Sequence, residues 1–256
     1  MRIGLIAPPW VPVPPPRYGG TEAVLDRLAR GFVEVGADVL LFTTGDSTCP
    51  VPREWVLPRA EPQRIGMGVL EMRHLIHAYE AVQDCDIVHD HTVFGPVYAD
   101  RFPWLRVVTT NHGPFNDELL DIYSAIAYRI PIIAISHAQA ATAGQVPIAA
   151  VIHHGIDLEQ LPVGEGRGGY LLFLGRMSPA KGAREAALVA RLAGVPLLMA
   201  AKMREREEYA YFEEHVEPLL GAEVQYVGEV GGAHKQQLLD DALALVNPIA
   251  WPEPFG

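Results

Sequence analysis

Two basic side chains flank a strand-to-helix turn in the second half of the chain. Arg176 directly follows the apolar run LLFLG, and Lys181 precedes Gly182 and an alanine-rich run that begins at Ala183. These runs predict a buried parallel strand and an amphipathic helix. The free N–H groups and partial positive charge at the start of such a helix, with two cations beside them, suit a phosphate or diphosphate. Two solvated charges on a surface loop are the alternative interpretation.

A glycine pair, Gly19 and Gly20, precedes a second predicted helix near the N-terminus. That helix is expected from an apolar stripe between residues 24 and 33, with Thr21 as its N-cap and Gly36 at its end. Because glycine has no Cβ, the backbone at the pair can approach a phosphate or a sugar closely. A tight turn without a ligand is the alternative.

Histidines recur where predicted strands end. Strands are expected at 2–7, 37–43, 86–88, 106–110, 131–135 and 149–152, with an irregular Pro-rich segment at 49–65 and a helix at 68–82. The histidines that follow the last four of these strands are His89, His91, His112, His137, His153 and His154. Ligands bind at this edge of an open parallel sheet. His89 and His91 point to the same side of a strand, but this pair lacks an obvious third ligand, so we predict no metal site.

Short apolar runs alternate with amphipathic runs in both halves of the chain, a pattern that makes the strands parallel. The predicted fold class is therefore α/β, with two Rossmann-like parallel-sheet domains that face a cleft. A glycine-rich segment at 161–169 is the expected linker. It separates an N-terminal domain, 1–160, from a partial C-terminal domain, 170–256. In the latter, strands are expected at 170–174, 196–201, 224–227 and 243–247, and helices at 183–193, 204–220 and 234–242.

Composition narrows the functional classes. The 256 residues are 49% hydrophobic, enough for a substantial core, and the net charge of −11 argues against a nucleic-acid binder. Cys49 and Cys85 form neither a disulfide framework nor a zinc motif, as expected of free thiols in a reducing compartment. No segment has the pattern of a signal peptide or the length of a membrane span. We therefore expect a cytoplasmic protein.

Six motifs in this order resemble glycosyltransferase family 4, whose members have the two-domain GT-B architecture. They are GGTE at 19–22, HG at 112–113, HGID at 154–157, the stretch from Gly175-Arg176 to Lys181-Gly182, VG at 227–228 and EPFG at 253–256. The resemblance covers nearly the whole chain. The stretches MSPAKG and VGEVGG are most similar to the bacterial branch that decorates secondary metabolites.

The resemblance implies a hexosyltransferase that moves a sugar from a nucleotide diphosphate donor to an acceptor, with retention at the anomeric carbon. It favours a UDP-sugar over a GDP-sugar as the donor and leaves open whether the acceptor is a small molecule or a glycan. Members of the family usually need neither a metal nor another cofactor, and none is predicted here.

Roles for individual residues also follow from the resemblance. Arg176 and Lys181 would hold the diphosphate and stabilise charge on the leaving group. Gly19 and Gly20 would let the first domain approach that diphosphate, and His112 would lie near the reacting sugar. The EPFG motif would bind the donor sugar, through the carboxylate of Glu253 and the backbone N–H groups of Phe255 and Gly256.

One departure from the family pattern concerns the C-terminal end. In the family, a second glutamate follows the EPFG motif at the start of a helix and holds the ribose, whereas this sequence stops at Gly256. The sequence therefore resembles a truncated transferase, and a second chain that supplies the missing part is one explanation. The alternative function is a catalytically incomplete nucleotide-binding fragment.

A different GT-B enzyme, such as a sugar epimerase or a phosphorylase, is a third hypothesis. A phosphorylase requires a lysine that binds pyridoxal. Only Lys202 and Lys235 follow Lys181, and neither has a convincing context for that role.

Overall fold

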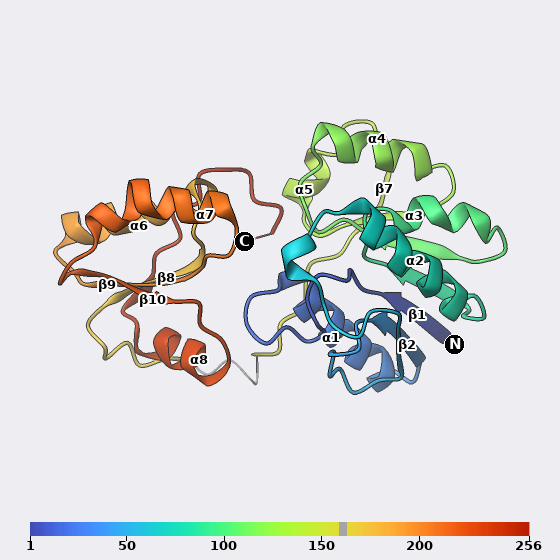
Figure 1. Ribbon diagram of the computed structural model, residues 1–256, viewed down its shortest axis with the longest axis horizontal. Helices are drawn as coiled ribbons and strands as arrows, with labels where there is room; N and C mark the ends of the chain where they lie inside the picture. The colour runs from blue at the N-terminus through green and yellow to red at the C-terminus, as the bar shows by residue number, and fades with distance from the viewer. Residues whose placement is uncertain (159–162, 256) are drawn as a thin grey trace. The chain divides into compact units, whose positions relative to one another are not determined.

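The computed structural model describes residues 1–158 and 163–255 and divides them into two compact units, each built on one parallel sheet (Figure 1). The first unit contains residues 1–15, 19–155 and 253–255, and the second contains 16–18 and the described part of 156–252. The expected linker, 161–169, falls within the range of the second unit, and its first two residues lie outside the described part of the chain. The predicted α/β class with two parallel sheets is confirmed.

The first sheet has seven strands in the order β3-β2-β1-β4-β5-β6-β7, and every pairing is parallel. The strands are β1 Arg2–Ile6, β2 Asp38–Thr43, β3 Arg53–Trp55, β4 Ile87–Asp90, β5 Val107–Thr110, β6 Ile132–Ala134 and β7 Ile148–Val151. Sequence analysis expected six of them and placed β3 in an irregular region. Three residues that include an arginine and a glutamate carry no apolar strand pattern.

Helices cover both faces of this sheet (Figure 1). They are α1 Gly20–Glu34, α2 Gly68–Val82, α3 Gly95–Tyr98, α4 Asp117–Ile126 and α5 His137–Ala141, with 3₁₀ turns η1 Pro62–Arg64 and η2 Ala99–Arg101. Leu25 of α1 packs on one side of the sheet with Leu5 and Leu41, while Tyr79 of α2 packs on the other with Val88. Burial on both faces explains the continuous apolar runs in the central strands β1 and β2.

The start of α1 differs from the sequence prediction. The carbonyl of Gly19 accepts the first helical hydrogen bond, from the N–H of Ala23 at 3.1 Å. Gly19 is therefore the N-cap, and Thr21 lies inside the first turn. The prediction of Thr21 as N-cap is wrong because the chain enters the helix earlier than side-chain capping preferences indicate.

The second sheet has four parallel strands in the order β10-β9-β8-β11. They are β8 Leu171–Arg176, β9 Leu197–Lys202, β10 Val224–Gly228 and β11 Ala244–Leu245. Helices α6 Ala183–Ala193 and α7 Arg206–Tyr211 lie over one face, and α8 Gly232–Asp241 lies over the other (Figure 1). The buried face of α6 is formed by Ala183, Ala186, Ala187 and Ala190. Such small side chains let the helix approach the sheet closely.

The charged helix expected at 204–220 is broken into three pieces. Helix α7 is followed by a π-helical turn, η5 Phe212–Val216, and by a 3₁₀ turn, η6 Glu217–Leu219. Pro218 lies in the last of these and has no N–H to continue the ladder of α-helical hydrogen bonds. The expected helix is therefore present over 206–219, but its α-helical hydrogen-bond pattern ends at Tyr211.

Each sheet contains a switch point, where the chain leaves neighbouring strands in opposite directions. In the first sheet, β2 lies on one side of β1 and β4 on the other; in the second, β9 and β11 flank β8 in the same way. Loops that leave the carboxyl ends of such strands diverge, and the space between them is where ligands bind in open α/β sheets. The two switch points therefore locate the candidate site in each unit.

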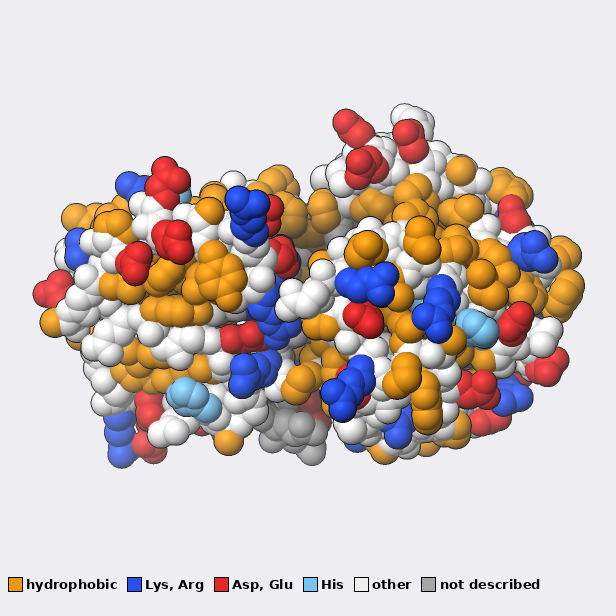
Figure 2. All heavy atoms as spheres, viewed as in Figure 1, with side chains coloured by type: hydrophobic (Ala, Val, Ile, Leu, Met, Phe, Trp, Pro, Cys, Tyr) orange, Lys and Arg blue, Asp and Glu red, His pale blue; other side chains and the backbone are white. Residues whose placement is uncertain are grey.

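Acidic and basic side chains are interspersed over both units on the face drawn in Figure 2, within a net charge of −11. Among the described residues, no helix combines the length and the apolar character that crossing a bilayer requires.

Candidate functional site

The two cations that sequence analysis assigned to a diphosphate lie at the switch point of the second sheet. Arg176 is the last residue of β8, and a 3₁₀ turn, η4 Pro179–Lys181, leads from it to α6. Between η4 and α6, Gly182 adopts φ +70°, and a Cβ there would collide with the carbonyl oxygen of Pro248. Only glycine fits this position. The turn thus holds both cations beside the N-terminus of an eleven-residue helix.

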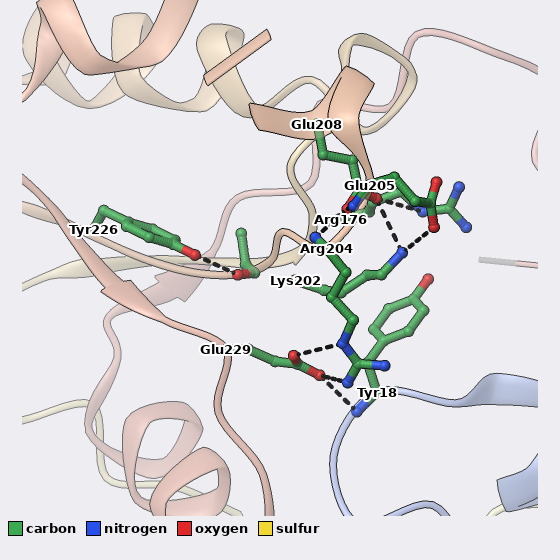
Figure 3. Close-up of polar contacts among 9 residues, drawn as sticks. Tyr18, Arg176, Lys202, Arg204, Glu205, Glu208, Tyr226 and Glu229 are labelled. Carbon is green, nitrogen blue, oxygen red and sulfur yellow. Dashed lines mark hydrogen bonds and ion pairs between the residues drawn. The ribbon is translucent and has the colours of Figure 1, made fainter. Parts of the chain in front are cut away.

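Arg176 faces a buried carboxylate that sequence analysis did not identify (Figure 3). Glu208 is 4% exposed, and Nε of Arg176 lies 3.6 Å from its Oε1. The carboxylate accepts hydrogen bonds from the backbone N–H groups of Arg204 at 2.7 Å and Glu205 at 3.1 Å, and from Nζ of Lys202 at 3.1 Å. Burial alone would raise the pKa of Glu208, but these hydrogen bonds and the lysine charge lower it below its ordinary value. Glu208 is therefore ionised and orients Arg176.

Lys202 is a third cation at the same edge of the sheet. It ends β9 directly beside Arg176 in the strand register, is 7% exposed, and bonds through Nζ to Glu205 and Glu208 (Figure 3). Sequence analysis considered this lysine only as a pyridoxal ligand. The signal that identifies its partners is a lysine at a strand end followed by acidic residues three and six positions later, the first turn of α7.

A second ion pair adjoins this network. The guanidinium of Arg204 donates to both carboxylate oxygens of Glu229, which follows β10. Residues 16–18 group with the second unit, and there the N–H of Tyr18 donates to Glu229 at 3.2 Å (Figure 3). The cationic edge is thus held by three carboxylates, Glu205, Glu208 and Glu229.

In the first unit, the two glycines of the pair have different surroundings. A Cβ on Gly19 would lie 2.6 Å from Cβ of Pro15, whereas a Cβ on Gly20 would meet nothing within 4 Å. Packing therefore requires Gly19, while the backbone of Gly20 borders open space at the first residue of α1. Gly20 is the residue of the pair whose lack of a side chain the fold does not explain.

This contrast predicts opposite outcomes for two alanine variants. Gly19→Ala should lower the free energy of unfolding by about 1–3 kcal/mol, because it overpacks the contact with Pro15. Gly20→Ala should leave stability equal or up to about 1 kcal/mol higher, because alanine favours a helix. If Gly20 has the role that the family resemblance implies, the variant should nevertheless weaken donor binding roughly tenfold, because the added methyl group keeps a diphosphate from the backbone. Urea unfolding and calorimetry measure the two effects. Unchanged donor affinity in Gly20→Ala would show that the pair is only a turn.

Four histidines at the carboxyl ends of β4, β5 and β7 form an array of ring contacts. Ring centroids lie 4.0 Å apart for His89 and His91, 5.1 Å for His91 and His112, and 5.3 Å for His112 and His154. Phe255 continues the array, 4.8 Å from His154. The structure thus brings the predicted residues His112 and Phe255 to one edge of the first sheet, with His154 between them.

These imidazoles are neutral at physiological pH. Burial lowers the pKa of His89 to about 4 and that of His112 to about 3, and it also lowers the pKa of His91 well below its ordinary value. Neighbouring imidazoles add to the effect for His91 and His112, because two cations side by side repel each other. The array therefore offers neutral hydrogen-bonding groups and no positive charge.

Helix α5 fixes the loop that carries His112. The side-chain amide of Gln139 donates to the carbonyls of Asn111 at 2.9 Å and Gly113 at 2.6 Å, on either side of the histidine. Ser136 caps α5 and also donates to the carbonyl of Pro254. One short helix thus holds both the His112 loop and the segment that contains Glu253 and Phe255.

Buried carboxylates fix the neighbouring loop, which carries His91. Asp90 accepts hydrogen bonds from the hydroxyl of Tyr79 at 2.7 Å and from the N–H of Thr92 at 2.8 Å. Glu71, in the first turn of α2, accepts from the N–H of Val93 at 2.9 Å. The position of His91 is therefore set from both sides.

Glu22 is a second ionisable group that the motif GGTE contains but sequence analysis assigned no role. It lies in the first turn of α1, is 5% exposed, and has its pKa raised to about 7 by burial. A carboxyl group with this pKa changes its charge within the physiological range. The raised pKa of Glu22 follows from its burial and could not be predicted from the residue type.

The raised pKa predicts a dependence of stability on pH. Between pH 4.5 and about 7, the folded chain keeps a proton on Glu22 that the unfolded chain has released, so stability falls as the pH rises. Glu22→Gln cannot ionise. The difference in free energy of unfolding between this variant and the natural chain should therefore shift by roughly 3 kcal/mol in favour of the variant as the pH rises from 4.5 to 8. Urea titrations at both pH values test this, with the exposed Glu34→Gln in the same helix as the control. Parallel pH profiles for Glu22→Gln and the natural chain would contradict the prediction.

The predicted site residues thus fall into two groups. Gly19, Gly20, His112, Glu253 and Phe255 belong to the first unit, and Arg176 and Lys181 belong to the second. Gly256 lies outside the described residues. Within the described chain, no group of three His, Cys, Asp or Glu side chains is arranged to hold a metal ion.

Two units, each built on one parallel α/β sheet, are the architecture of the GT-B glycosyltransferases. The family model of Glycosyltransferase Family 4 matches residues 18–160. The chain belongs to this family and is a glycosyltransferase. The resemblance inferred from the motifs is therefore confirmed.

Several solved structures share this fold. AviGT4, a glycosyltransferase involved in avilamycin A biosynthesis, is 28% identical with a TM-score of 0.68; the match covers 100% of this chain and 73% of that one. Sucrose-phosphate synthase from Thermosynechococcus elongatus is 18% identical with a TM-score of 0.74, over 100% and 77% of the two chains. The catalytic domain of starch synthase IV from Arabidopsis thaliana, bound to ADP and acarbose, is 12% identical with a TM-score of 0.65, over 100% and 79%. No curated protein matches the chain by sequence.

Proposed function

We propose that this glycosyltransferase moves a hexose from a nucleotide diphosphate donor, with UDP as the favoured nucleotide, to a hydroxyl group of an acceptor, with retention at the anomeric carbon. The observation that carries the proposal is the pair of cations, Arg176 and Lys181, held by a rigid turn at the N-terminus of α6. A diphosphate carries the charge that this arrangement complements.

The two cations have a direct role in the chemical step. The bond between the anomeric carbon and the diphosphate oxygen breaks, and its electron pair stays on the leaving group. Arg176 and Lys181 stabilise this growing negative charge more strongly than the charge of the intact donor, and such differential stabilisation lowers the barrier. Glu208 keeps the guanidinium of Arg176 in place before the donor arrives.

Retention requires that the acceptor oxygen form its bond on the face from which the diphosphate leaves. The acceptor hydroxyl attacks the anomeric carbon, and its proton passes to the departing phosphate oxygen. This route needs no carboxylate nucleophile. His112, neutral and fixed by its neighbours, would hydrogen-bond the donor sugar, and Glu253 would accept hydrogen bonds from the sugar hydroxyls.

A small molecule or a glycan is the proposed acceptor. The likeness to AviGT4, a glycosyltransferase of avilamycin A biosynthesis, supports a secondary metabolite as its source.

Calorimetric titration of the chain with UDP, GDP and ADP tests the donor site, with Arg176→Ala and Arg191→Ala as a matched pair. Arg191 lies in the last turn of α6, at the opposite end of the same helix from the proposed site. We expect UDP to bind tightest, with binding lost in Arg176→Ala and kept in Arg191→Ala. Absence of binding for all three nucleotides would contradict the proposal. Binding without sugar transfer would favour a nucleotide-binding fragment that needs a further segment.

A further inference from the structure

The histidine array contains one direct hydrogen bond between two imidazoles. Nδ1 of His91 lies 2.8 Å from Nε2 of His112. Since both rings are neutral, one of these nitrogens carries a proton and the other carries a lone pair. The direction of this bond decides whether the other ring nitrogen of His112, Nδ1, carries a proton.

The surroundings of His91 determine the direction. His91 is 6% exposed, and its other nitrogen, Nε2, is buried without a hydrogen-bond partner in the described part of the chain. If His91 accepted at Nδ1, its proton would be on Nε2, as a buried N–H with nothing to donate to. If His91 donates from Nδ1, Nε2 keeps only an unused lone pair. Orphaned buried N–H groups are the rarer case in proteins.

The other neighbours do not oppose this arrangement. His89 hydrogen-bonds through Nε2 to the hydroxyl of Thr110 at 2.7 Å, and its contact with His91 is between rings tilted by 36°. Since the loop of His91 is fixed by Asp90 and Glu71, and the loop of His112 by Gln139, neither ring moves freely to another partner.

We propose that His91 is a positioning residue that fixes His112 in the tautomer with its proton on Nδ1. His91 donates from Nδ1 to Nε2 of His112, which leaves His112 with a single N–H that points away from His91. His112 therefore acts toward its ligand as a hydrogen-bond donor and not as an acceptor. The consequence for catalysis rests on the proposed function: His112 donates to an oxygen of the donor sugar, and the hydroxyl proton of that oxygen remains available to an acceptor group.

Histidine side-chain nitrogen NMR tests the tautomer directly, because it separates protonated from unprotonated ring nitrogens. In the natural chain, we expect both His91 and His112 to be protonated on Nδ1 and unprotonated on Nε2. A proton on Nε2 of His112 would overturn the proposal. This readout needs no activity, so it stands even if the proposed sugar transfer fails.

Three variants establish that His91 is the cause. His91→Phe keeps an aromatic ring but removes the donor, and it should release His112 from the single tautomer. His91→Asn places an amide N–H near the position of Nδ1, and it should restore the tautomer. His89→Phe is the matched control, since His89 does not bond to His112, and it should leave the spectrum of His112 unchanged. If His91→Phe also left it unchanged, His91 would not set the tautomer.

Kinetics then link the tautomer to turnover. His91→Phe should lower kcat roughly tenfold, the effect of one hydrogen bond lost in the transition state, with a smaller change in KM for the donor. His91→Asn should recover most of that loss. Equal losses in both variants would indicate packing instead of hydrogen-bond direction and would overturn the catalytic part of the inference.

Discussion

The double variant Arg176→Ala/Lys181→Ala should lose sugar transfer by roughly 10⁴-fold in kcat/KM. Removal of one preorganised group that stabilises developing charge typically lowers the rate by roughly 10²–10³-fold. Both cations act on the same leaving group, so their effects on the rate are coupled. Each single variant should lose a large part of the total rate factor, and the two losses should not be additive. Transfer rates with saturating and limiting donor separate the loss in kcat from the loss in donor affinity.

Folding must remain intact for this result to have meaning. Arg176 has a side chain 44% exposed, and its partner Glu208 keeps its other hydrogen bonds in the variant, so we expect little change in stability. Arg191→Ala removes the same charge from the far end of α6 and should transfer sugar at the natural rate. Undiminished turnover of the double variant would contradict the assignment of the diphosphate site.

Lys202→Met should destabilise the chain by about 3–5 kcal/mol, because it removes the buried cation that compensates Glu208. The carboxylate would retain two backbone hydrogen bonds but would lose its charged partner within hydrogen-bonding distance. It would then compete with the donor for Arg176, so donor affinity should also fall. Urea unfolding at pH 7 measures the first effect and calorimetry the second.

The pH dependence of this variant has a definite sign. In the natural chain the lowered pKa of Glu208 contributes stability that is present above the unfolded value of 4.5 and is lost as the pH falls through the folded value. Lys202→Met removes part of that contribution. The difference in stability between the natural chain and the variant should therefore be largest at neutral pH and should shrink below pH 4.5.

Two further variants separate charge from packing. Glu205→Gln alters the partner of Lys202 whose side chain is 43% exposed, and it should cost about 0–1 kcal/mol. Lys202→Met/Glu208→Gln removes both buried charges and should recover a large part of the stability lost in Lys202→Met. If the double variant were no more stable than the single one, the loss would come from packing around the lysine stem.

The features that the sequence predicted depend on residues near one another in the chain, and most of those that it missed depend on residues far apart. In the described part of the chain, apolar runs and helical stripes predicted ten of the eleven strands and the limits of α2 and α6, because these signals arise from neighbours along the chain. Two features were not predicted, for local reasons. Strand β3 contains too few apolar residues to show a strand pattern, and the 3₁₀ turn at the end of the helix that begins with α7 contains a proline.

By itself, the sequence determined the α/β class, the family and the placement of Arg176 and Lys181 at a strand-to-helix turn, since each depends on the order of residues along the chain. Only the tertiary structure decided the rest of the site. The contact of Glu208 with Arg176, the raised pKa of Glu22, and the hydrogen bond between His91 and His112 depend on burial and on strands brought together by the sheet. Desolvation and side-chain direction act between residues far apart in sequence, and no local pattern encodes them.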